Sequence, residues 1–221
     1  MLQMRVLEPQ PIPEAEESAS YDAMVRRHRG LLNLPFVKFV QHIGLERGRV
    51  LDIGTGPGWI PIELATRQPG WEIWGLDASA DMLALAERHA SATGVADRVR
   101  FVAGDATALP FDDGMFDLVI SHFTLHHVDR PEQLFNEAAR VVRGGGKVVI
   151  KDLRRPPRWK AALLVAFSRY VLGQTTSQLQ MYRDSLAAAL SLGEVATALK
   201  ASKLAMAQVR GSRGLYYVIT S

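Results

Sequence analysis

The sequence has no cysteine among its 221 residues. Disulfide bonds, thiolate metal sites and cysteine nucleophiles are therefore excluded for the chain as given. Its six histidines include no His-Glu-x-x-His motif, so no metal site is expected. The sequence also lacks an apolar run approaching the ~20 residues that a transmembrane helix needs. These absences favour a protein that works through its backbone, its carboxylates and its neutral polar side chains.

The amino-terminal stretch, residues 1–17, lacks the basic and then apolar pattern of a secretion signal. Acidic side chains outnumber basic ones there. The expected location is therefore the cytoplasm. Elsewhere the composition, 48% hydrophobic and 22% charged, is sufficient for one domain with a full core.

Negative charge is scarce toward the carboxyl end of the chain. Residues 151–221 hold 11 Lys and Arg against 3 Asp and Glu, whereas residues 1–150 hold 15 against 20, so the net charges are +8 and −5. A solvated positive face is one interpretation, and an anionic acceptor bound by the region around residues 151–169 is another. No nucleic-acid partner is expected, because the basic residues are not interleaved with aromatic ones as in a stacking platform.

Three alternating glycines follow a short apolar strand in residues 50–58, Val-Leu-Asp-Ile-Gly-Thr-Gly-Pro-Gly. Glycine at Gly54, Gly56 and Gly58 lets the backbone turn sharply and lets a ligand lie against it. The spacing differs from the dinucleotide motif G-x-G-x-x-G, since Trp59 stands in the slot of its third glycine, and no phosphate loop is present. A tight strand–helix turn without a ligand is the alternative.

Two carboxylates end the next apolar segments. Asp77 follows Trp71–Leu76 and Asp105 follows Val99–Val102. At the tip of a second parallel strand a carboxylate can accept hydrogen bonds from both hydroxyls of a ribose. At the tip of the third it can accept one from the exocyclic amine of adenine. Together these positions predict a site for an adenosine-containing ligand.

The glycine motif, preceded by two apolar residues and Asp52, resembles the first motif of the class I, Rossmann-like methyltransferases that use S-adenosylmethionine. The resemblance extends over residues 50–152, and Leu109-Pro110-Phe111 is similar to the small-molecule branch, especially the quinone-biosynthesis methyltransferases. It implies transfer of a methyl group from S-adenosyl-L-methionine to a small-molecule acceptor, at an oxygen, carbon or nitrogen atom that stays open. It also implies a doubly wound α/β fold: a mostly parallel seven-stranded sheet, helices on both faces and a carboxyl-terminal antiparallel hairpin.

The resemblance implies a set of cofactor contacts along the strand tips. They are Tyr21, Asp52, Gly54, Thr55, Gly56, Gly58, Asp77, Ala78, Met82, Gly104, Asp105, Ala106, Ser121 and Phe123. For two of these residues a structural role is an equally good interpretation. Tyr21 either closes over the methionine end of the cofactor or packs its helix on the sheet, and Met82 either touches adenine or belongs to the core.

Candidate acid–base groups follow the fourth and fifth strands. His122, His126, His127 and Asp152 all lie at the carboxyl edge expected to face the acceptor. The alternatives are structural: His126 matches an architectural position of the family, and Asp152 is equally able to pair with Arg154 or Arg155. Whether a general base is used at all stays open.

One methyltransferase domain is expected over residues 1–221. Its parts are a helical cover (1–45), a cofactor-binding core (46–152), a lid or acceptor region (153–190) and a closing helix and hairpin (191–221). Residues 158–172 predict a short apolar and basic helix that is a lid, a weak membrane-surface contact or a partner helix. Ser191 to Glu194 predicts a capped last helix, and residues 204–209 and 215–220 predict the two closing strands.

Two other functions stay open. A protein that binds the cofactor without transferring the methyl group, as a regulatory or partner subunit, would carry the same motifs. Methylation of RNA or protein is less favoured, since no added RNA-binding module and no Asn-Pro-Pro-Tyr-type motif is present. The oligomeric state is also open.

Overall fold

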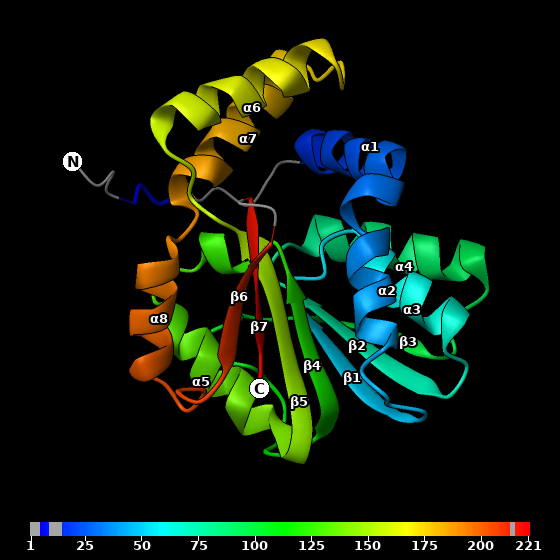
Figure 1. Ribbon diagram of the computed structural model, residues 1–221. Helices are drawn as coiled ribbons and strands as arrows, with labels where there is room; N and C mark the ends of the chain where they lie inside the picture. Colours follow the sequence, from blue (N-terminus) through cyan, green and yellow to red (C-terminus); the bar gives the residue numbers. More distant parts are fainter. Residues whose placement is uncertain (1–4, 9–14, 213–214) are drawn as a thin grey trace.

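The computed structural model describes residues 5–8, 15–212 and 215–221. Its strands are β1 (Gly48–Ile53), β2 (Trp71–Asp77), β3 (Val99–Ala103), β4 (Phe116–His122), β5 (Val142–Leu153), β6 (Gln208–Ser212) and β7 (Tyr216–Thr220). They form one sheet in the order β3-β2-β1-β4-β5-β7-β6 (Figure 1). The first five strands are parallel, and β7 runs antiparallel to both β5 and β6. The predicted fold class is confirmed.

Helices cover both faces of this sheet (Figure 1). They are α1 (Ala15–Leu32), α2 (Leu34–Gln41), α3 (Trp59–Arg67), α4 (Ala80–Thr93), α5 (Pro131–Val141), α6 (Arg158–Tyr170), α7 (Thr176–Ala188) and α8 (Leu192–Lys200), with a 3₁₀ turn η1 (Leu125–His127). One core cluster joins the sheet to α5 and α8, and a second joins it to α2, α3 and α4. Successive residues of β1 alternate between them, Val50 in one and Leu51 in the other, as expected for a strand buried on both faces.

Side-chain caps fix two helix starts, and the capped start predicted at Ser191 is confirmed. The Ser79 hydroxyl accepts a hydrogen bond from the Met82 amide and begins α4. Ser191 and Glu194 form a reciprocal capping box at α8. Each cap satisfies backbone amides that have no partner within the helix.

The prediction for the first closing strand is partly wrong. Residues 204–207 form a turn, and β6 runs from Gln208 to Ser212. Leu204 is buried whereas Met206 is exposed, so the apolar side chains there do not share one strand face. The first helix begins at Ala15, within the expected helical cover (1–45), of which residues 1–4 and 9–14 lie outside the described residues.

Candidate functional site

The predicted site residues meet at the carboxyl edge of the parallel strands. Register pairs Ile53 of β1 with Leu76 of β2 on one side and with Ser121 of β4 on the other. The chain order therefore reverses at β1, with β2 and β3 on one side and β4 and β5 on the other. Ligands of open α/β sheets bind in the crevice at such a switch point.

The glycine loop has one open position. Gly54, Gly56 and Gly58 all have positive φ, 72°, 54° and 78°. A Cβ at Gly54 would clash with Thr124 and one at Gly58 would clash with Ala86, but a Cβ at Gly56 would meet nothing within 4 Å. The outer glycines are thus needed for packing, whereas Gly56 keeps space free beside the backbone.

The amides of this loop are already used inside the protein. Gly54 and Thr55 both donate to the Leu76 carbonyl oxygen, at 2.7 and 2.9 Å. The Gly56 amide donates to Asp77 Oδ2 at 2.7 Å. A phosphate-binding loop instead points its amides at the ligand. The geometry therefore favours a ligand part without phosphate at this bend.

Asp77 is fixed at the mouth of the crevice. Besides Gly56, it accepts a hydrogen bond from the Ser79 amide through Oδ1 at 2.9 Å. Burial and, after it, the neighbouring charge of Asp77 raise the pKa of Tyr21 to about 12. Tyr21 is therefore placed beside this carboxylate, as the prediction of a closing residue requires.

Asp52 is a buried carboxyl group with an unused oxygen. The Thr55 hydroxyl donates to its Oδ2 at 2.9 Å, while no described residue hydrogen-bonds to Oδ1. Burial and, to a smaller extent, the charge of Asp77 raise the pKa of Asp52 to about 7. A buried acceptor without a partner is costly, so Oδ1 is suited to a donor or cation supplied by a ligand.

The raised pKa of Asp52 predicts a pH-dependent stability. Between about pH 4 and pH 7 the carboxyl is protonated in the folded protein but ionised in the unfolded chain, so the folded state binds more protons. The free energy of unfolding must therefore fall as pH rises through this window. Urea unfolding of the ligand-free protein at several pH values should show the fall, and the Asp52→Asn variant should lack it. Equal pH dependence in both proteins would contradict the assignment.

A three-residue clamp holds α1 over the glycine loop. Asp22 accepts a hydrogen bond from Trp59 Nε1 at 2.7 Å, and its other oxygen lies 3.4 Å from His89 Nε2. His89 Nδ1 lies 2.9 Å from the Pro57 carbonyl oxygen, and its ring stacks on Trp59 at 4.2 Å. Trp59, which occupies the slot of the third dinucleotide glycine, thus joins α1, α3 and α4 above the bend.

The third strand tip forms an exposed rim. Asp105 Oδ1 accepts hydrogen bonds from both the amide and the hydroxyl of Thr107, at 2.7 and 2.8 Å. The backbone of this tip is joined to that of β2, since the Gly104 amide donates to the Asp77 carbonyl oxygen. Of the other predicted contacts, Ala78 is exposed, Ala106 is half-buried and Met82 is buried. All lie beside the crevice, and their contact with a cofactor stays a prediction.

The fourth strand tip is strained. In the described part of the chain, Phe123 is the one non-glycine residue with a positive φ, at 60°. Its amide donates to the Lys151 carbonyl oxygen at 3.0 Å, and the preceding Ser121 hydroxyl donates to the Ile53 carbonyl oxygen. Strain of this kind persists only where the surroundings impose it, and it is concentrated at functional sites.

An aromatic cluster containing one lysine adjoins this tip. The His122 ring stacks between Phe36 and Phe123, with ring centroids 4.6 and 4.0 Å away. Lys151 Nζ lies 5.3 Å from the Phe123 ring and 4.8 Å from the Tyr216 ring. Burial lowers the pKa of Lys151 to about 8, and burial together with the Lys151 charge lowers that of His122, whose Nε2 has no described partner. The cluster therefore brings together a cation and a neutral imidazole.

His126 and Asp152 are occupied by one another. His126 Nδ1 lies 2.7 Å from Asp152 Oδ1, and the His126 amide donates to Oδ2. Asp152 also accepts a hydrogen bond from the Leu153 amide, whereas Arg155 pairs with Glu194. These contacts join η1 to β5 and fit the architectural alternative for His126. Asp152 pairs with His126 and not, as its own alternative had it, with Arg154 or Arg155. Their role in catalysis stays a prediction.

His127 is held by the amino-terminal segment. Its Nδ1 lies 2.6 Å from Glu8 Oε2, and Glu8, His126 and His127 are the one group of three potential metal ligands found in the described ranges. The ligands of a tetrahedral zinc ion stand ~3 Å or more apart, given metal–ligand distances of about 2.0–2.1 Å. An ion pair accounts for the short Glu8–His127 distance.

Several residues of this site have no sequence signal of their own. Lys151 belongs to the basic region expected to hold an anionic acceptor, but nothing in the sequence sets it apart from its neighbours. Phe36 and Tyr216 come from distant parts of the chain, as do Asp22 and His89 of the clamp. Only the alternation along β5, which places Lys151 on the opposite face from Asp152, indicates that the two have different surroundings.

The fold and this crevice define a class: a doubly wound α/β protein with an adenosine-type site at its switch point. Residues 51–150 match the family described as methyltransferase domain. The demethylmenaquinone methyltransferase of Thermus thermophilus is 36% identical over 146 residues, 65% of this chain and 66% of the relative. The ubiquinone/menaquinone biosynthesis C-methyltransferase of Roseobacter denitrificans is 35% identical over 123 residues, 54% and 49% of the two chains. A methyltransferase structure from Aquifex aeolicus shares the fold with a TM-score of 0.66 at 19% identity, covering 94% of this chain and 97% of the other.

Over residues 51–150 the chain is similar to the class I, Rossmann-like methyltransferases, and the resemblance predicted from the sequence is confirmed. The chain covers between about half and just under two thirds of the length of these curated relatives.

Proposed function

We propose that this protein transfers the methyl group of S-adenosyl-L-methionine to a small-molecule acceptor. The observation that carries the proposal is the open space beside Gly56, whose amide donates to the Asp77 carboxylate and whose neighbour Thr55 donates to the buried Asp52 carboxyl group. A cofactor with a cationic amino-acid end and a ribose presents donors to both carboxyl groups, and its lack of phosphate suits a loop whose amides are already used. The match to the methyltransferase domain family supports the same conclusion.

Different residues would contact different parts of the cofactor. The unpartnered Asp52 Oδ1 would accept a hydrogen bond from the amino-acid end, and Asp77 would accept those of the ribose. Asp105 and Met82 would contact the adenine, while Tyr21 on α1 would close the crevice and exclude water. When bound, S-adenosylmethionine supplies an electrophilic methyl carbon on sulfur, so the protein mainly has to align the acceptor and keep water out.

We propose that the acceptor is an anion with a planar, unsaturated ring or chain. The Lys151 ammonium group and the Phe123 and Tyr216 rings fit a phenolate or enolate oxygen and its π-system. The acceptor donates its electron pair to the methyl carbon while the carbon–sulfur pair returns to sulfur, giving a neutral thioether. His122, neutral and with a free Nε2, is placed to accept a proton from an acceptor that arrives un-ionised.

The predicted division of the chain becomes part of this proposal. Residues 46–152 carry the cofactor contacts, and part of the cover, 1–45, holds Tyr21 and the Asp22 clamp. Residues 153–190 and 191–221 complete the acceptor side and close the sheet. The cytoplasmic location stays a prediction.

An acceptor screen tests the proposal. The protein would be incubated with S-adenosylmethionine and a panel of phenols, enols and reduced quinones, and S-adenosylhomocysteine would be measured by mass spectrometry. We expect product formation that depends on the acceptor and is lost in the Asp77→Ala variant. Cofactor binding without product from any acceptor would instead support the non-catalytic binding protein.

A further inference from the structure

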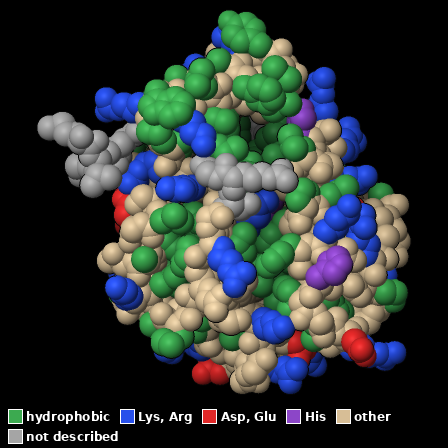
Figure 2. Space-filling model, viewed as in Figure 1, with side chains coloured by type: hydrophobic (Ala, Val, Ile, Leu, Met, Phe, Trp, Pro, Cys, Tyr) green, Lys and Arg blue, Asp and Glu red, His purple; other side chains and the backbone are tan. Residues whose placement is uncertain are grey.

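A row of large apolar side chains is exposed along α6. Trp159, Leu163, Phe167 and Tyr170 are spaced by four, four and three residues, so they share one face of the helix. Their exposed fractions run from 52% at Phe167 to 82% at Tyr170. Figure 2 shows hydrophobic side chains gathered over α6 at the top of the molecule, with Lys and Arg side chains beside them. We call these four residues the apolar stripe.

The stripe takes no part in holding α6 to the protein. The opposite face of the helix packs on α7, where Val165 forms a small core with Leu179 and Leu186. Ala161 and Leu164 add to that core. Large contiguous apolar surface on a water-soluble chain marks a site of contact with a partner or a membrane.

The charge of this region is one-sided. α6 contains Arg158, Lys160 and Arg169 but no Asp or Glu, and residues 151–221 carry a net charge of +8. Around the helix, Lys160 stands next to the stripe, whereas Arg158 and Arg169 stand about 80–100° beyond its other edge, toward the face that packs on α7. An aromatic and aliphatic face on a helix whose charged residues are all basic is the pattern of a helix that lies in a lipid–water interface.

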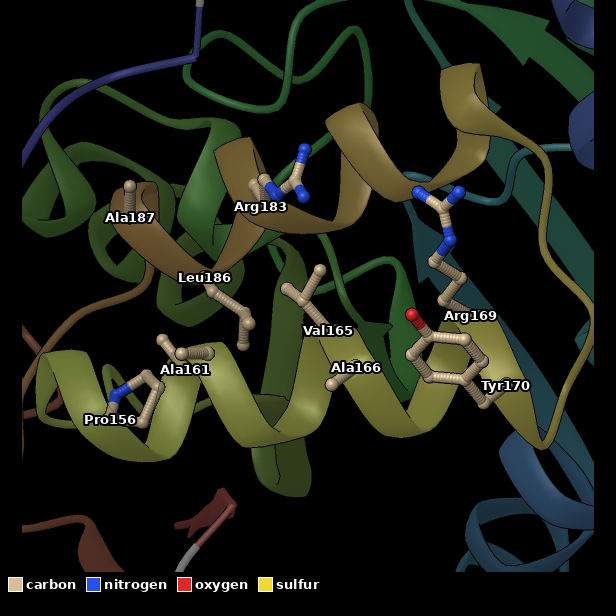
Figure 3. Close-up of a pocket in the computed structure, with 10 residues that line it drawn as sticks. Pro156, Ala161, Val165, Ala166, Arg169, Tyr170, Arg183, Leu186 and Ala187 are labelled. Carbon is tan, nitrogen blue, oxygen red and sulfur yellow. The ribbon is translucent and has the colours of Figure 1, made fainter.

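A groove between α6 and α7 adds a second feature. Its volume is about 440 Å³, and its walls include Val165, Ala166 and Leu186. Arg169 and Arg183 also line it, and their side chains extend toward the same side (Figure 3). Within the described ranges neither guanidinium forms an ion pair with a carboxylate, so both are available to anionic groups such as lipid phosphates.

We propose that α6 docks on the surface of an anionic lipid bilayer. The apolar stripe enters the boundary between headgroups and acyl chains, and Arg158, Lys160, Arg169 and Arg183 meet the phosphate groups. None of the helices in the described part of the chain is long and apolar enough to cross a bilayer, so the contact is peripheral. α6 begins five residues after β5 ends, above the carboxyl edge of the sheet (Figure 1), which turns the crevice toward the membrane.

Vesicle flotation tests this docking without reference to catalysis. The full-length protein would be mixed with phosphatidylcholine vesicles, with or without 30 mol% phosphatidylglycerol (roughly the anionic content that attracts basic segments), at low and high salt. We expect flotation with the anionic vesicles that weakens at high salt. The variant W159S/L163S/F167S should lose at least ~10-fold in partitioning, because its apolar contribution is gone. R169Q/R183Q should lose mainly the salt-dependent part.

Controls separate the docking face from general effects. Met206 is 94% exposed on a turn remote from α6, so M206S should float like the wild type. Calorimetric binding of S-adenosylmethionine should be the same for the stripe variant and the wild type, which shows that the fold is kept even if no acceptor is known. The proposal is overturned if the wild type does not float with anionic vesicles or if the stripe variant floats equally well. It is also overturned if the wild type is a dimer that the stripe substitutions dissociate, since the stripe would then be an interface between two copies.

Discussion

Replacing Gly56 by alanine should weaken the binding of S-adenosylmethionine roughly 100-fold, or by about 2.7 kcal/mol. Two effects add. The added methyl group enters the space beside the loop, and alanine at a φ of 54° is strained by about 1–2 kcal/mol, which the bend can relieve only by moving. The Gly56 amide would then shift from Asp77, the carboxylate expected to hold the ribose. Calorimetric titration measures the change.

The matched control is Gly94→Ala. Gly94 caps the end of α4 with a φ of 74°, and a Cβ there also meets nothing within 4 Å. The substitution therefore imposes the same backbone strain away from the crevice. It should lower the melting temperature about as much as Gly56→Ala and leave the dissociation constant unchanged. Equal affinities for Gly56→Ala and Gly94→Ala would show that the open position does not face the ligand.

Replacing Lys151 by methionine should lower kcat/KM for an anionic acceptor about 100-fold, the usual effect of removing one group that stabilises a reacting oxyanion. Methionine keeps the length of the side chain between the Phe123 and Tyr216 rings but removes the charge. The affinity for S-adenosylmethionine should not change. Because burial lowers the pKa of Lys151 to about 8, the wild-type kcat/KM should fall above pH 8 as the ammonium group loses its proton.

Lys147→Met is the control for Lys151. Lys147 lies four residues earlier on β5, toward the opposite edge of the sheet, where its ammonium group donates to the Ile43 carbonyl oxygen. It should keep both the rate and the pH profile of the wild type. The role of Lys151 is contradicted if the two variants lose activity equally or if the fall above pH 8 persists in Lys151→Met.

The sheet and the cofactor side of the site were predictable because both follow from local sequence. Gly56 and Asp77 each stand directly after an apolar strand segment, and parallel strands bring their carboxyl tips to one edge whatever the rest of the chain does. The same argument gave the positions of Asp52 and Asp105. The cap at Ser191 could be predicted because a cap acts within one helical turn.

The rest of the site depends on contacts between distant segments. The clamp joins Asp22 to His89, and the aromatic cluster joins Phe36 to Tyr216 through His122 and Lys151. No spacing rule relates residues that far apart. Burial also depends on contacts between distant segments. The unpartnered oxygen of Asp52 and the lowered pKa of Lys151 arise from this packing and not from residue type.

The prediction of a strand at residues 204–207, where the structure has a turn, was wrong for a related reason. Leu204 and Met206 alternate as strand residues do, but one is covered by the end of α8 and the other points into water. Apolar alternation indicates a strand only where a neighbouring strand has an edge to pair with.

Titration of S-adenosylmethionine into the wild type and Asp77→Ala by calorimetry tests the central claim most directly. The claim is that the carboxyl edge around the glycine bend holds an adenosyl cofactor. It predicts saturable binding with one site per chain in the wild type and at least ~30-fold weaker binding in Asp77→Ala, since a buried ribose would lose its charged acceptor. An absence of heat with the wild type at saturating cofactor, or identical affinity in both proteins, would contradict it.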